Sequence, residues 1–178
     1  MKMALAAVLS ASLSVLCAAT PAAAGEVFGG MLAHEVNTPF TLKTGESGVD
    51  FQIGFRGAQI EALKTLGKPA PYIFASVNSA GDTSFVAAGL GWQIGKTVYV
   101  RPGIGLALHT GRIPQGTAGG RRVDLGSRLL FEPEISFGYR LSEKAAVELN
   151  WTHISNAQLL SGQNPGLDMI GVRARFKL

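Results

Sequence analysis

Hydrophobic and polar residues alternate with a period of two along most of the chain that follows residue 24. In the clearest run, Val49, Phe51, Ile53 and Phe55 alternate with Asp50, Gln52, Gly54 and Arg56. The alternation recurs over 98–109 and 129–140, and this period predicts strands with one apolar and one polar face. Less regular strands are predicted over 28–38, 70–79, 84–94, 145–155 and 168–178, which gives eight strands in total.

The segments between these strands are of two lengths. Residues 95–97 and 142–144 are short turns, whereas 110–123 and 156–167 are longer and polar. An even number of strands, alternation over about ten residues and turns of alternating length are typical of outer-membrane barrels. We therefore predict an all-β fold, an eight-stranded antiparallel outer-membrane β-barrel, with both termini in the periplasm and the long segments outside.

A soluble secreted sandwich or lipocalin-like barrel is the main alternative. Such a fold would turn the apolar faces inward and the charged faces outward, and it could bury faces of this kind. The polar faces carry Arg56, Arg101, Glu132, Glu134 and Arg140, while the opposite faces are apolar almost throughout. This separation favours the membrane barrel, and the direction in which the two faces point distinguishes the two folds.

Residues 1–24 have the order of a secretory signal peptide. Lys2 precedes an Ala-, Leu- and Val-rich stretch, and small residues lead up to Ala24, after which we expect cleavage. Residues 25–178 then form a single membrane β-barrel domain. The only cysteine, Cys17, lies in the leader, which excludes a disulfide scaffold. Beyond the leader, the sequence has no apolar run of about 18 residues that would predict a membrane-spanning helix.

Candidate chemistry lies at the end of the seventh predicted strand. Continuing the apolar parity of Leu149 and Trp151 places His153 and Ser155 on the same outer face. Asp168 opens the following antiparallel strand and shares the parity of that strand's apolar residues. A serine, a histidine and a carboxylate on one patch are the groups that ester hydrolysis needs, because the histidine activates the hydroxyl and the carboxylate orients the histidine.

The same residues have a simpler interpretation. A single His-x-Ser pair is a weak motif, and polar side chains are ordinary at the headgroup level of a membrane. In that case His153 and Ser155 are interfacial residues and Asp168 is a loop residue. The spacing alone leaves both interpretations open. His34 and His109 are weaker candidates, and we expect them to be solvated or to line the barrel.

The segment Trp151-Thr152-His153-Ile154-Ser155-Asn156-Ala157, followed by Asn164-Pro165-Gly166-Leu167-Asp168, resembles the lipid A 3-O-deacylase (PagL-type) family of outer-membrane acyl hydrolases. The resemblance implies a serine esterase that removes the ester-linked acyl chain at position 3 of lipid A, a lipopolysaccharide modification. It implies Ser155 as nucleophile, His153 as general base and Asp168 as orienting acid. The family's acid is typically glutamate, so Asp168 is one methylene shorter.

Further expectations concern the surroundings of this site. Asn156 and Asn164 are candidates for an oxyanion hole or for shaping the site, although both also suit loop turns. We expect no metal and no cofactor, because the chain shows no ligands at metal spacing. The expected partners are lipid A and the outer membrane and not nucleic acid, while the oligomeric state, a homodimer included, stays open. A non-catalytic structural or adhesin-like barrel and an acyltransferase remain as alternative functions.

Overall fold

The computed structural model describes residues 25–41, 44–111, 123–157, 159 and 166–178, and apart from one short 3-10 helix its regular secondary structure is all β-strand. The predicted leader, residues 1–24, lies outside the described residues. The strands are β1 (Glu26–Ala33), β2 (Val49–Arg56), β3 (Ala70–Asn78), β4 (Phe85–Gly91), β5 (Ile94–Gly95), β6 (Val98–His109), β7 (Leu129–Arg140), β8 (Ala145–Ile154) and β9 (Leu167–Lys177). Within these described ranges, no helix is long and apolar enough to cross a membrane.

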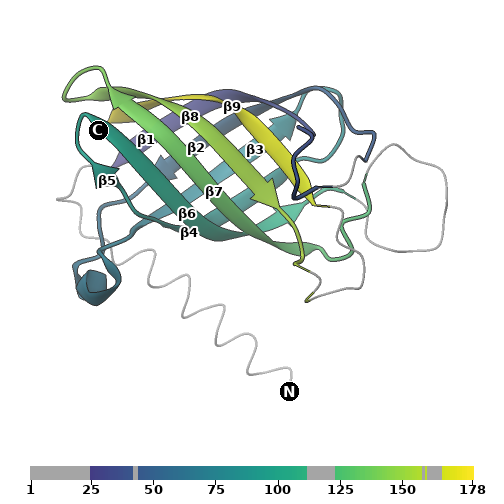
Figure 1. Ribbon diagram of the computed structural model, residues 1–178, viewed down its shortest axis with the longest axis horizontal. Helices are drawn as coiled ribbons and strands as arrows, with labels where there is room; N and C mark the ends of the chain where they lie inside the picture. Colours follow the sequence, from purple (N-terminus) through teal and green to yellow (C-terminus); the bar gives the residue numbers. More distant parts are fainter. Residues whose placement is uncertain (1–24, 42–43, 112–122, 158, 160–165) are drawn as a thin grey trace.

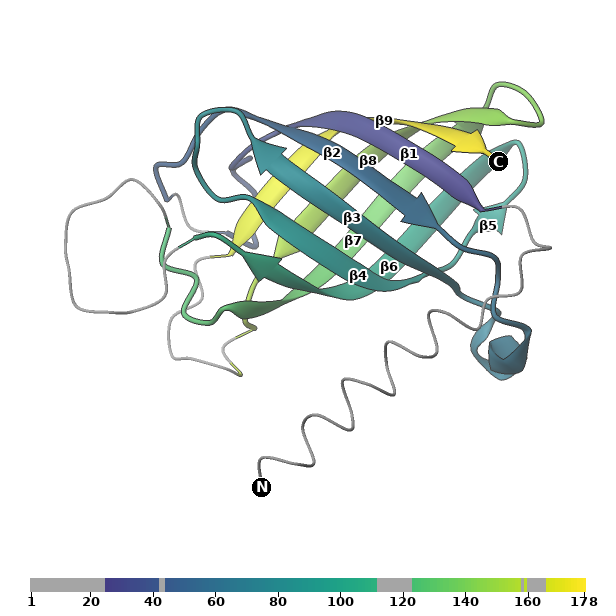
Figure 2. The same cartoon turned by 180° about the vertical axis from the view of Figure 1, so that it is seen from behind.

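Eight of the strands close into an antiparallel barrel, as predicted. Among these eight strands, neighbours in sequence pair with one another, β4 pairs with β6, and β1 also pairs with β9, so the barrel closes (Figure 1). The two-residue β5 pairs only with β6. Figure 2 shows the opposite wall, with β2, β3 and β4 in front. Closure satisfies the backbone hydrogen bonds of every long strand, which a wall facing lipid requires.

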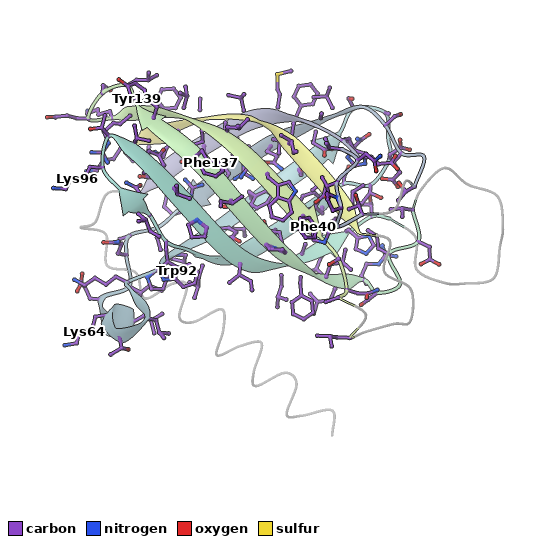
Figure 3. All side chains as sticks on the ribbon, viewed as in Figure 1. Phe40, Lys64, Trp92, Lys96, Phe137 and Tyr139 are labelled. Atoms are coloured by element: carbon purple, nitrogen blue, oxygen red, sulfur yellow. The ribbon has the colours of Figure 1, made fainter. Side chains whose placement is uncertain are left out.

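The two ends of the barrel differ. At one end, here called the loop end, β1 leads to β2, β3 to β4, β6 to β7 and β8 to β9. The opposite end carries the C-terminus, the 141–144 turn and the short 3-10 helix η1 (Glu61–Leu66). Figure 3 labels Phe40 at the loop end and Trp92 near the opposite end.

The apolar faces of the strands point outward, which decides between the two folds that the sequence left open. Large hydrophobic side chains are exposed on all eight barrel strands, among them Val27, Met31, Phe51, Ile53, Phe55, Ile73, Val77, Val86, Ile104, Leu106, Leu108, Phe137, Tyr139, Val147, Leu149, Val172 and Phe176. A soluble barrel of this size would bury these side chains. A continuous apolar outer wall instead matches the hydrocarbon core of a bilayer.

Charged residues line the lumen, and several of them form oppositely charged pairs. Arg173 is fully buried; its Nη1 donates to Glu134 Oε2 at 2.6 Å and its Nε donates to Gln52 Oε1 at 2.8 Å. Nearer the opposite end, Arg56 lies 3.4 Å from Glu148. Removing one partner of such a buried pair leaves an uncompensated charge, so the lumen residues depend on one another.

Some predicted strand boundaries were wrong. The first strand was expected over 28–38 but ends at Ala33, because the chain then leaves the ladder, and Val36 and Thr38 bond Asp168 outside the regular register. The fourth was expected over 84–94 but ends at Gly91; Trp92 N still bonds Pro102 O, and pairing resumes only at β5. Ser155 lies one residue beyond β8.

A lumen glycine allows an aromatic ring to lie across the neighbouring strand β7. Gly138 on β7 pairs with Tyr99 on β6, and a Cβ added at Gly138 would lie 2.1 Å from the Tyr99 ring. The Tyr99 hydroxyl donates to Glu148 at 2.8 Å, so the ring position is linked to the charged lumen. The missing side chain at Gly138 therefore provides the space that this hydrogen bond needs.

We predict that Gly138→Ala displaces the Tyr99 ring and lowers the free energy of unfolding by ~1–3 kcal/mol, the usual cost of overpacking. The matched control is Gly91→Ala, where the nearest atom to an added Cβ is 3.5 Å away. Urea unfolding of the detergent-folded barrel, followed by tryptophan fluorescence, measures both variants. Equal unfolding midpoints for the two variants would contradict the prediction, because they would show that the added methyl group at position 138 costs no more than the one at position 91.

Candidate active site

The predicted site residues lie at the loop end, where β8 and β9 pair. The register places His153 directly opposite Asp168, and Trp151 opposite Ile170. By parity these residues share the outer face of the wall with Leu149 and Val172, both of which are exposed. His153 and Asp168 are nevertheless buried, because residues of the loop end cover them.

His153 and Asp168 form a direct hydrogen bond. His153 Nδ1 lies 2.8 Å from Asp168 Oδ1, and the Asp168 side chain is fully buried while that of His153 is 10% exposed. With its Nδ1 hydrogen directed at the carboxylate, the ring has Nε2 available to accept a proton. The shorter aspartate therefore reaches the histidine, because the two residues are direct cross-strand partners.

Ser155 follows His153 on the same side of the chain and is fixed by β7. Its amide donates to Phe131 O at 3.1 Å, and Phe131 N donates to Ser155 O at 2.8 Å. Ser155 is buried. Among the described residues, no hydrogen bond joins the Ser155 hydroxyl to His153. Hydrogen bonds of this kind often tighten only when a substrate binds, so the placement remains compatible with a nucleophile and its base.

Part of the segment that follows β1, residues 36–40, covers the His153–Asp168 pair from outside the barrel. Val36 N donates to the Asp168 backbone carbonyl at 2.9 Å, and the Thr38 hydroxyl donates to Asp168 Oδ2. Phe40 packs on Trp151, with ring centroids 6.0 Å apart. Sequence reasoning missed this contribution, because Thr38 and Asp168 are 130 residues apart.

Trp151 was expected only as an apolar wall residue, but its indole is part of the site. Trp151 Nε1 donates to Asp168 Oδ1 at 2.9 Å. The indole also stacks beside His153, with centroids 5.9 Å apart and an interplanar angle of 24°. The period-two pattern could have suggested proximity to His153, since the two residues share a face, but not the hydrogen bond.

Gly166 borders the histidine on the side of the β8–β9 connection. Its φ of +64° lies in the left-handed region, and an added Cβ would be 2.8 Å from His153 Cε1. Position 166 therefore requires a glycine.

Of the two asparagine candidates, the structure describes Asn156. Asn156 is fully buried, and its Nδ2 donates to Leu125 O at 2.8 Å, which ties the end of β8 to the segment before β7. Asn164 lies outside the described residues. Among the residues described, no cluster of three His, Cys, Asp or Glu side chains could hold a metal ion.

The other two histidines lie inside the loop end of the barrel. His109 Nε2 lies 2.6 Å from Ser127 O. His34 lies just beyond β1 and contacts Asp50 Oδ2 through Nδ1 and Glu46 Oε2 through Nε2, both at 2.8 Å. Its side chain is fully buried. The sequence, which places only Glu35 beside His34, did not reveal these two carboxylates.

His34 and Glu46 join several segments of the loop end. Burial alone would lower the pKa of His34, but hydrogen bonds to Asp50 and Glu46 and their negative charges raise it to about 9. Burial alone would raise the pKa of Glu46, but hydrogen bonds from His34, Val123 and Thr83 lower it. His34 is therefore a cation that bridges two carboxylates.

We predict that the loop end loosens at alkaline pH. Because the folded pKa of His34 lies above its ordinary value of 6.5, its stabilisation is complete below about pH 6.5 and is lost as the pH rises through about 9. Hydrogen exchange of the His34 and Thr83 amides, corrected for intrinsic rates, should accelerate over this range. The Leu141 amide, bonded to Ala145 O in the opposite-end turn, is the control. Unchanged protection at His34 would contradict this assignment.

The outward-facing apolar wall, the charged lumen and the closed antiparallel sheet define a class of protein, the small outer-membrane β-barrels. The sequence profile of the lipid A 3-O-deacylase (PagL) family matches residues 31–177, so the chain belongs to that family. The protein is accordingly an outer-membrane protein.

Solved structures support the fold. The crystal structure of the outer membrane enzyme PagL superposes with a TM-score of 0.61 and 21% sequence identity, covering 86% of this chain and 99% of that one. A de novo designed transmembrane β-barrel superposes with a TM-score of 0.52 and 11% identity, covering 89% and 98%. No curated protein sequence matches the chain closely enough to count as a relative.

Proposed function

We propose that the protein hydrolyses the 3-O-linked acyl chain of lipid A, with Ser155 as nucleophile, His153 as general base and Asp168 as orienting acid. Membership of the lipid A 3-O-deacylase family supports the reaction and the substrate class. The observation that carries the assignment of the site is the 2.8 Å contact between His153 and Asp168 on the outward parity, with Ser155 two residues further along.

The proposed reaction has two halves. His153 Nε2 takes the hydroxyl proton of Ser155 while Oγ bonds to the acyl carbonyl carbon, and the bond to the 3-oxygen of lipid A then breaks as that oxygen receives the proton. In the second half, water gives a proton to His153 and its oxygen attacks the acyl-enzyme. The fatty acid leaves and Ser155 regains its proton. Asp168 stabilises the charge that His153 carries between these steps.

The outward parity of the site supports a substrate that stays in the bilayer. Leu149 and Val172 are exposed on the wall beside Trp151, and Phe40 is 69% exposed above it. An acyl chain could lie along this apolar surface, whereas the charged lumen would reject it. We propose that the loop end faces the outside of the cell, which places the site beside lipid A in the outer leaflet.

Asn156 is proposed to shape the site. Its hydrogen bond to Leu125 O supports this role, because it fixes the backbone that carries Ser155. For Asn164 the proposal of an oxyanion donor rests on the sequence alone.

The proposal predicts that the refolded protein removes one ester-linked hydroxyacyl chain from lipid A, and that Ser155→Ala abolishes this loss. Residual activity should be at most about 10⁻³ of the parent, since a serine hydrolase without its nucleophile keeps little more than background catalysis. Mass spectrometry of lipid A and of released fatty acid measures both products.

The matched control is Ser136→Ala, which makes the same substitution at a buried serine on the lumen side of β7. This variant should retain the activity of the parent. Transfer of the acyl chain to another lipid, without free fatty acid, would indicate an acyltransferase. An unchanged lipid profile with the parent protein would favour a non-catalytic barrel and contradict the proposal.

A further inference from the structure

The Asp168 carboxylate is held by more residues than the proposed triad requires. Oδ1 receives hydrogen bonds from His153 Nδ1 at 2.8 Å and from Trp151 Nε1 at 2.9 Å, and Oδ2 receives the hydroxyl of Thr38. These donors come from β8 and from the segment after β1. Neither Thr38 nor Trp151 is a member of the proposed triad of nucleophile, base and acid.

These hydrogen bonds restrain the carboxylate at both oxygens. The Asp168 side chain is fully buried, so water does not compete for either oxygen. Without the bonds to Trp151 and Thr38, the carboxylate could rotate about its two side-chain bonds and lose its alignment with His153. Val36 N adds a bond to the Asp168 backbone, which anchors the covering segment to the same residue.

Trp151 also restrains the histidine. Its indole stacks beside the imidazole, and Phe40 packs on the indole, so the segment that supplies Thr38 also supports Trp151. Trp151 therefore contacts both members of the His153–Asp168 pair, one by a hydrogen bond and the other by ring packing.

We propose that Trp151 and Thr38 are positioning residues, which hold the Asp168 carboxylate in the orientation that accepts the Nδ1 hydrogen of His153. This inference rests on the proposed function, in which His153 serves as the base. Neither residue exchanges a proton with the substrate. The effect of Thr38 reaches the reaction through Asp168, and that of Trp151 through Asp168 and the stacked His153 ring, so both belong to the chemical step and not to substrate binding.

The test compares variants that each remove a single hydrogen-bond donor to Asp168. Trp151→Phe removes the indole N–H but keeps an aromatic ring, and Thr38→Val removes the hydroxyl. Each should lower kcat about tenfold with KM unchanged, and the double variant about a hundredfold, the scale expected for hydrogen bonds to a buried charge. Thr38→Ser, which restores the hydroxyl, should recover most of the parent kcat.

The chain offers a matched tryptophan control. Its second tryptophan, Trp92, also donates its indole N–H, at 2.7 Å to Leu66 O near the opposite end, so Trp92→Phe should leave kcat unchanged. Rates are expressed per folded molecule, with folding measured by heat-modifiable gel mobility. Because Thr38 lies outside the strands, Thr38→Val and Thr38→Ser still test the proposal even if Trp151→Phe lowers the folded fraction.

The outcomes separate this inference from the function on which it rests. If Ser155→Ala retains activity, the proposed function itself fails. If Ser155→Ala is inactive while Trp151→Phe and Thr38→Val keep the parent kcat, only the positioning role is overturned. A rise in KM alone, or a Thr38→Ser variant as slow as Thr38→Val, would also overturn it.

Discussion

The pairing register of β8 and β9 is the constraint on which the candidate site depends. Because side chains alternate across a strand, a slip of one residue would send Asp168 to the lumen while His153 stayed outside. The observed register makes the two residues direct partners, and their side chains meet at 2.8 Å. A side chain as short as aspartate reaches His153 there because the backbones are already adjacent.

The charged lumen supports that register from the other side of the wall. On β9, Arg173 faces inward and bonds Gln52 on β2 and Glu134 on β7, so one side chain links three strands across the barrel. A slipped β9 would place Arg173 against lipid and remove the cation that lies closest to Glu134, which is costly in hydrocarbon. The residues that fill the lumen and the residues of the outer site therefore specify the same pairing.

Much of this arrangement could be predicted from alternation alone. The pattern placed His153, Ser155 and Asp168 on one face, and the charged parity indicated a lumen that the structure confirms. Whether the apolar faces point outward or inward could not be predicted from alternation alone, because a soluble barrel has the same alternation. The contribution of Thr38 to the site could not be predicted, because the sequence pattern assigned this residue to the first strand. The carboxylates around His34 were missed for a similar reason, because Glu46 lies in a connection without periodicity.

The central claim is that His153 and Asp168 activate Ser155 on the bilayer side of the barrel wall. A long-chain alkyl fluorophosphonate, which reacts with activated serines and partitions into lipid, tests it directly when the protein is embedded in vesicles. Peptide mapping should find the adduct on Ser155 in the parent protein and little or none in His153→Gln. An unlabelled Ser155, or equal labelling in His153→Gln, would contradict the account.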